Sequence, residues 1–166
     1  MKISPKLLAV CALSFAVACG GSTDPKTLAS EGSTALNSRD YQAALEKFDG
    51  ALATLDPATD AGTHLKASLG KCRALAHIDA GKAKTEFLAL VDGGKVEYTH
   101  YSQIAVDFAG ASAWNEAIEV LSVGKEKLPG EEKMEKLVTK IGDLAKKDGA
   151  SSEAMKALEG LGYVGN

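Results

Sequence analysis

Three histidines and three cysteines are among the residues of this 166-residue chain that could bind a metal ion or act as nucleophiles. The histidines His64, His77 and His100 are separated by 13 and 23 residues, so no two of them stand four residues apart on a helix. The chain has no HExxH pattern and no repeated Cys/His spacing typical of zinc sites. We therefore expect no metal site.

Other catalytic patterns are also missing. The glycine pairs Gly20-Gly21 and Gly93-Gly94 fit a tether and a helix stop, and no GxSxG sequence supplies a nucleophilic serine. The acidic pair Glu131-Glu132 is explained by its place in the first turn of a helix, where the helix dipole favours negative charge. We expect no nucleotide loop, no cofactor, no small-molecule substrate and no enzymatic activity.

Any functional residues of this chain are expected to be positioned by helices. It contains 27 Ala and 19 Leu against 9 Val and 5 Ile, and Ala and Leu lose little side-chain freedom in a helix. The length fits one domain, and with aromatics at only 5% the core must be built from small aliphatic side chains. The composition predicts an all-α fold.

Residues 1–18 have the pattern of a secretory signal. Lys2 and Lys6 precede an apolar run from Leu7 to Ala18. The run has about 12 residues, whereas a membrane-spanning helix needs about 20. We therefore interpret this segment as a signal peptide.

The end of this run, Ala16-Val17-Ala18-Cys19-Gly20-Gly21, resembles the lipobox of bacterial lipoproteins. The resemblance implies cleavage before Cys19, acyl chains such as palmitate on that residue, and, because no Asp follows it, the outer membrane. Ordinary secretory cleavage after Ala18, leaving a soluble protein, is the alternative. Residues 19–25 would be a lipidated Gly/Ser tether.

Residues 26–129 show a period of about 34 residues and resemble tetratricopeptide repeats (TPR), pairs of antiparallel helices. A first unit ends at Pro57, a third ends at Pro129, and a degenerate one lies between them. The resemblance implies a right-handed superhelix of about three helix pairs; an unrelated helical bundle is the alternative. The predicted packing residues are Gly32, Tyr41, Ala44, Phe48, Ala51, Gly70, Phe87, Ala105, Phe108, Trp114, Ala117 and Leu121.

Residues 130–166 are expected to form capping helices and a tail. Met134, Leu137, Val138, Ile141 and Leu144 form one apolar stripe on a helix from Glu131 to Lys147, followed by a second helix from Ser151. The tail either packs back through Leu161 and Tyr163 or docks to another protein.

The TPR resemblance also implies a concave groove lined by the first helix of each pair. Its expected partner-binding residues are Ala29, Ser33, Leu36, Asn37, His64, Ala67, Lys71, Ala74, Thr99, Ser102, Val106 and Ala109, together with Lys26, Leu75 and Gly110. Small and apolar side chains dominate this set, which suits an extended or helical segment of a protein partner.

The charge of the chain without its signal peptide limits the classes of partner that it is expected to bind. Removing the signal leaves 17 basic and 22 acidic residues, and an acidic surface disfavours nucleic acid. The resulting hypothesis is a lipid-anchored TPR scaffold for protein–protein interaction in the bacterial cell envelope, as adaptor of an assembly or secretion complex. The alternative is a soluble periplasmic accessory subunit that docks to a secreted enzyme through its tail.

Overall fold

A computed structural model describes residues 24–165. The described chain is helical throughout, which confirms the all-α prediction, and contains no strand. The proposed signal peptide, Cys19 and most of the tether lie outside these residues. Its helices are α1 (Pro25–Asn37), α2 (Tyr41–Leu52), α3 (Ala61–Ala76), α4 (Ala80–Asp92), α5 (Tyr98–Gly110), α6 (Trp114–Lys127), α7 (Glu132–Lys147) and α8 (Ser152–Gly160).

Short polar side chains begin several of the helices. Asp24, Asp40 and Asp79 accept hydrogen bonds from the backbone N–H three residues later, at 2.8, 3.2 and 3.0 Å, and Ser151 does the same at 3.2 Å. These side chains satisfy N–H groups that have no partner within the helix. The starts of α1, α2, α4 and α8 are therefore set by local sequence.

Two turns within helix pairs use left-handed backbone at residues other than glycine. Arg39 has φ 62° between α1 and α2, and Ser112 has φ 56° between α5 and α6. The corresponding turn between α7 and α8 contains Gly149, at φ 71°. Left-handed backbone is sterically costly for a side chain with Cβ, so packing of the paired helices holds Arg39 and Ser112 in place.

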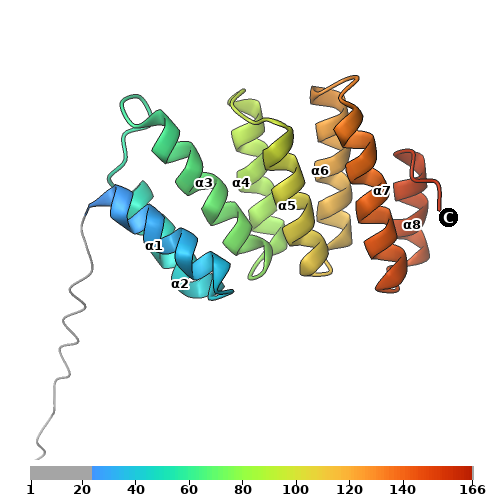
Figure 1. The fold of residues 1–166 in the computed structure, drawn as a ribbon, viewed down its shortest axis with the longest axis horizontal. Helices are drawn as coiled ribbons and strands as arrows, with labels where there is room; N and C mark the ends of the chain where they lie inside the picture. The colour runs from blue at the N-terminus through green and yellow to red at the C-terminus, as the bar shows by residue number, and fades with distance from the viewer. Residues whose placement is uncertain (1–23, 166) are drawn as a thin grey trace, which may run out of the picture.

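The helices form antiparallel pairs that stack in one row. Figure 1 shows α3, α5 and α7 side by side on one face, with α4, α6 and α8 behind them. The α1/α2 pair is tilted against the rest at the N-terminal end of the row, and α3 packs on both α1 and α2. Among the described residues, no helix combines the length and apolar character needed to cross a membrane.

The predicted packing residues lie between these helices. Tyr41 and Trp114 are half-buried, and the Tyr41 ring stacks on His77 with a centroid distance of 3.9 Å. The other predicted packing residues are buried, namely Gly32, Ala44, Phe48, Ala51, Gly70, Phe87, Ala105, Phe108, Ala117 and Leu121.

Phe48 lies between two glycines of different helices. A Cβ built on Gly32 of α1 would be 2.9 Å from the Phe48 ring, and one on Gly70 of α3 would be closer still. Real Cβ atoms essentially never come this close to another heavy atom. The absent side chains thus allow α1 and α3 to approach α2 through a single ring.

The C-terminal tail packs back onto α7. Tyr163 is 3% exposed, its ring lies against Gly142, and its hydroxyl donates to Asp143 Oδ1 at 3.1 Å. The carbonyl of Leu161 accepts a hydrogen bond from Lys125 Nζ at 2.7 Å. Of the two alternatives for the tail, the structure therefore shows the packed one.

Candidate functional site

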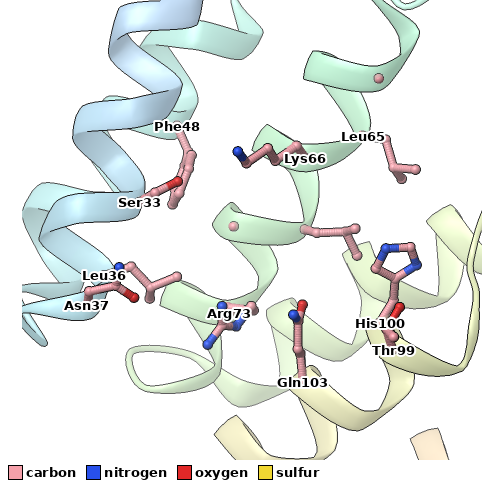
Figure 2. Close-up of a pocket in the computed structure, with 13 residues that line it drawn as sticks. Ser33, Leu36, Asn37, Phe48, Leu65, Lys66, Arg73, Thr99, His100 and Gln103 are labelled. Atoms are coloured by element: carbon pink, nitrogen blue, oxygen red, sulfur yellow. The ribbon is translucent and has the colours of Figure 1, made fainter.

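A cleft opens on the face formed by the first helices of the pairs. It has a volume of about 330 Å³ and is lined by α1, α3 and α5, with the Phe48 ring of α2 at its base. Figure 2 shows side chains of all three first helices converging on it. The lining residues are Ser33, Leu36, Asn37, Phe48, Gly62, Leu65, Lys66, Leu69, Gly70, Arg73, Thr99, His100 and Gln103.

The cleft has an apolar floor and a polar rim. Leu36 and Leu69 are each 8% exposed, and Leu65 is half-buried beside them. Around this floor stand hydroxyl, amide and cationic side chains, and none of the lining residues is Asp or Glu. A floor of this kind with a few polar groups around it is typical of binding sites. The rim residues are Ser33, Asn37, Lys66, Arg73, Thr99, His100 and Gln103.

Two rim side chains are held by neighbouring groups. Arg73 Nε donates to Asp107 Oδ2 at 2.6 Å, which ties α3 to α5, and His77 Nε2 lies 3.6 Å from the other oxygen of Asp107. His100 Nδ1 accepts the backbone N–H of Glu97 at 3.0 Å. The guanidinium and the imidazole are therefore positioned before any ligand arrives.

Twelve of the predicted groove residues divide into three groups, and the other three, Lys26, Leu75 and Gly110, do not line the cleft. Ser33, Leu36, Asn37 and Thr99 line the cleft, while Ser102 and Val106 are half-buried on α5 beyond it. A second group is buried in helix packing and presents no surface: Ala29, Ala67, Ala74 and Ala109.

His64 and Lys71 form the third group and require a correction. They lie on the other side of α3, where both line a small cavity with Leu52 of α2 and Leu90 of α4. These two residues do not share the surface of Ser33 and Thr99. The predicted groove set is therefore wrong in register on α3.

Helix geometry explains this error. The cleft residues of α3 are Gly62, Lys66, Leu69 and Arg73, a spacing that keeps them on one helical face. The predicted residues 64, 67, 71 and 74 come from a register about two residues different, and two residues turn a helix by about 200°. We expected the first groove position of this helix at His64, but α3 already begins at Ala61. The earlier start of the helix is the feature that the prediction missed.

Lys71 has a structural role on the second-helix side. Its Nζ lies 3.0 Å from Asp49 Oδ1 and 3.1 Å from Glu86 Oε2, joining α2, α3 and α4. Burial lowers the pKa of Lys71, but the hydrogen bonds to the two carboxylates raise it by more, so the net shift is upward. The Lys71 ammonium group therefore binds the two carboxylates of this cluster.

The described residues contain few groups suited to metal binding or to nucleophilic catalysis. They contain no group of three His, Cys, Asp or Glu side chains that could hold a metal ion. Cys72 is 1% exposed, and burial raises the pKa of its thiol to about 12, so it remains protonated at neutral pH. The cleft can bind a ligand through hydrogen bonds, cationic groups and apolar contact.

The C-terminal sequence Gly160-Leu161-Gly162-Tyr163-Val164-Gly165 has the GxGxxG spacing of dinucleotide-binding loops, although no nucleotide loop was expected from the sequence. A dinucleotide-binding loop of this type follows a strand and begins a helix. Here the sequence follows the end of α8, and its Tyr163 is buried against α7. The spacing is therefore not a nucleotide loop in this fold.

No protein-family model matches the chain, and neither a curated protein nor a solved structure shows a significant match to it.

Proposed function

We propose that this chain is a lipid-anchored TPR-type scaffold of the bacterial cell envelope that binds an extended segment of a protein partner in the cleft of α1, α3 and α5. The carrying observation is the cleft itself, since three successive first helices contribute to one apolar floor with a polar rim. Extended segments bind such surfaces by placing side chains on the floor and backbone groups against the rim.

The helix spacing supports the TPR part of the proposal. First helices α5 and α7 begin at Tyr98 and Glu132, and second helices α4 and α6 begin at Ala80 and Trp114. Both intervals equal the TPR period of about 34 residues. The other intervals between corresponding helices are longer, and the longest runs from the start of α2 at Tyr41 to the start of α4, because the α2–α3 connection and α3 itself are longer.

The envelope part of the proposal depends on Cys19 and the lipobox-like sequence around it. Mass spectrometry of the mature N-terminus should find an acylated Cys19. Membrane fractionation of the Cys19→Ala variant should move the protein to the soluble fraction. Unchanged membrane association of that variant would contradict lipidation at Cys19.

The binding part can be tested by filling the cleft. Thr99→Trp adds a large side chain at an exposed position of the cleft rim, and Thr85→Trp makes the same change at an exposed position of α4. A photo-crosslinking residue at Gln103 should capture a specific partner, and Thr99→Trp should abolish that capture. Equal capture by both tryptophan variants would refute the assignment of the cleft.

A further inference from the structure

Charge is divided between the two layers of helices. The first helices α1, α3, α5 and α7 contain nine Lys or Arg and five Asp or Glu, although the whole chain has a net charge of -3. The second helices α2, α4, α6 and α8 contain six Lys or Arg and nine Asp or Glu. Even without Lys71, which pairs with Asp49 and Glu86 on the other side of α3, the first helices contain more basic than acidic residues.

Five of the nine basic residues of this layer lie on α7, together with three acidic residues. Four exposed lysines, Lys133, Lys136, Lys140 and Lys147, form what we call the lysine stripe. At 100° per residue they fall within an arc of about 60° on one flank of the helix. The four lysines therefore lie on one surface of α7.

Contacts of α7 show which flank this is. Lys133 Nζ lies 5.6 Å from the centroid of the Tyr98 ring, at the start of the adjacent first helix α5. On the opposite flank, Glu135 pairs with Lys125 of α6, and Gly142 contacts Tyr163 beyond α8. The lysine stripe thus faces away from the second helices and continues the face on which the cleft opens.

Between the cleft and the lysine stripe, the part of α5 beyond its first turn presents no unpaired charge, whereas at the start of α5 Glu97 and Glu131 line a small cavity with Thr99 and Lys133. The only ionisable carboxylate on α5 is Asp107, and it is paired with Arg73. The remaining α5 residues on this side are uncharged: Thr99, Ser102, Gln103, Val106 and Gly110. On the far side of this row, α3 presents Lys66 to the cleft, while Arg73 is already paired with Asp107. Across α3, α5 and α7 the surface is therefore basic, neutral and basic.

The distance between the two basic zones predicts the length of a peptide segment that could reach both. Packed helices lie about 8–10 Å apart, so α3 and α7, with α5 between them, are separated by about 16–20 Å. An extended peptide advances about 3.3 Å per residue and spans this distance in about five or six residues. Lys66 and Lys136 stand at similar heights, five and four residues from the starts of their helices.

Building on the function proposed above, we propose that the partner segment is an extended peptide with acidic residues at two points about five or six residues apart and uncharged residues between them. One acidic point pairs with Lys66 in the cleft and the other with the lysine stripe. The uncharged centre crosses the hydroxyl and amide groups of α5, which can hydrogen-bond to a peptide backbone.

A uniformly charged polyanion fits the same surface less well. It would place negative charge over the neutral row of α5, where no lysine or arginine compensates it. Along the outer side of α7 it would also meet Glu132 and Asp143. The alternation of charge therefore favours a peptide over a lipid surface or a nucleic acid.

Fluorescence anisotropy with synthetic peptides and the full chain tests this inference. The probe peptide carries two pairs of glutamates separated by five uncharged residues and a fluorescein label. Two reference peptides have the same length, one with all four glutamates adjacent and one with glutamine in their place. We expect the spaced peptide to bind at least fivefold more tightly than either reference.

Charge reversal supplies the matched variants. Lys136→Glu with Lys140→Glu changes the lysine stripe, and Lys82→Glu with Lys156→Glu makes the same net change at exposed positions of α4 and α8. The stripe variant should lose about tenfold in affinity, because attraction is replaced by repulsion at two positions. The control variant should bind as the unaltered chain does, and circular dichroism should show both variants folded.

Several results would overturn the inference. These are equal binding of the three peptides, equal loss in the two variants, or stripe-dependent binding to phosphatidylglycerol vesicles without binding of the spaced peptide. If the partner crosslinked at Gln103 is still captured by the stripe variant, the acidic pattern is wrong while the proposed function stands. If Thr99→Trp leaves capture unchanged, the proposed function itself fails.

Discussion

Gly70→Ala is the substitution whose effect the structure predicts most directly. A Cβ at this position would lie 2.6 and 2.7 Å from two carbons of the Phe48 ring and closer still to a third. The ring cannot move away from α3, because on its other side Gly32 of α1 has no room for more than a hydrogen. The added methyl group must therefore separate α3 from α2 and α1.

The magnitude is a balance of two terms. Forcing one extra methyl into a closely packed core costs about 3 kcal/mol at the upper end of the usual range. Alanine in place of glycine within a helix returns about 1 kcal/mol. We expect a net loss of about 2 kcal/mol in the free energy of unfolding. This corresponds to a fall of about 6 °C in melting temperature for a chain of this size.

Thermal and urea unfolding followed by circular dichroism at 222 nm measures this effect. Gly62→Ala is the matched control on the same helix, because a Cβ there has no atom within 4 Å, and we expect it to leave stability unchanged or raise it by up to about 1 kcal/mol. Phe48→Leu removes the ring, so in a double-mutant cycle it should recover at least about 1 kcal/mol of the cost of Gly70→Ala. A Gly70→Ala protein as stable as the Gly62→Ala protein, or strict additivity with Phe48→Leu, would refute the packing argument.

Three further substitution or labelling experiments follow from contacts described above. Cys72, whose pKa burial raises to about 12, should resist iodoacetamide at pH 8 in the native protein and react in urea, as measured by mass spectrometry of its peptide; rapid native labelling would contradict its burial. Arg73→Ala and Asp107→Asn should each cost about 1 kcal/mol, discounted because the pair is partly exposed, and should couple in a double-mutant cycle, whereas additive costs would show no interaction. Tyr163→Ala should lower the melting temperature by several degrees. Burial first, and then the Asp143 carboxylate, raise the pKa of the Tyr163 phenol, so its contribution is complete below pH 10 and is lost as pH increases beyond that value. Tyr163→Phe should reduce this alkaline loss, and an unchanged alkaline profile would contradict the assignment.

Much of the helical framework is readable from local sequence. Capping residues such as Asp40 and Asp79 stand next to the helices that they begin. Residues 44, 48 and 51 fall on one helical face by period alone, and all three are buried. Such features depend on neighbours within about one turn or two, so a sequence pattern contains them.

The cleft is less predictable because it depends on how α3 is rotated about its axis. An uncertainty of two residues in the start of a helix turns it by about 200°, which moved the prediction from Lys66 to His64. Contacts between distant residues escaped as well. The stacking of Tyr41 on His77 joins two residues that lie on different helix pairs, and no pattern near either residue announces it.

The buried apolar residues form two separate clusters, and this division has a consequence for how the molecule opens. The smaller cluster contains Ala29 and Phe48 of the first pair and Leu55 just after α2, together with Ala67 and Ala74 of α3. The larger cluster extends from Leu69 of α3 to Tyr163. Cooperative opening units follow such clusters, and the unit with less buried apolar surface opens at lower free energy. The α1/α2 pair should therefore exchange its amide hydrogens first, while the stack from α3 onward stays closed. Because α1 forms one wall of the cleft, a ligand bound there contacts both the α1/α2 pair and the rest of the stack. Part of its binding free energy is therefore used to keep the α1/α2 pair closed.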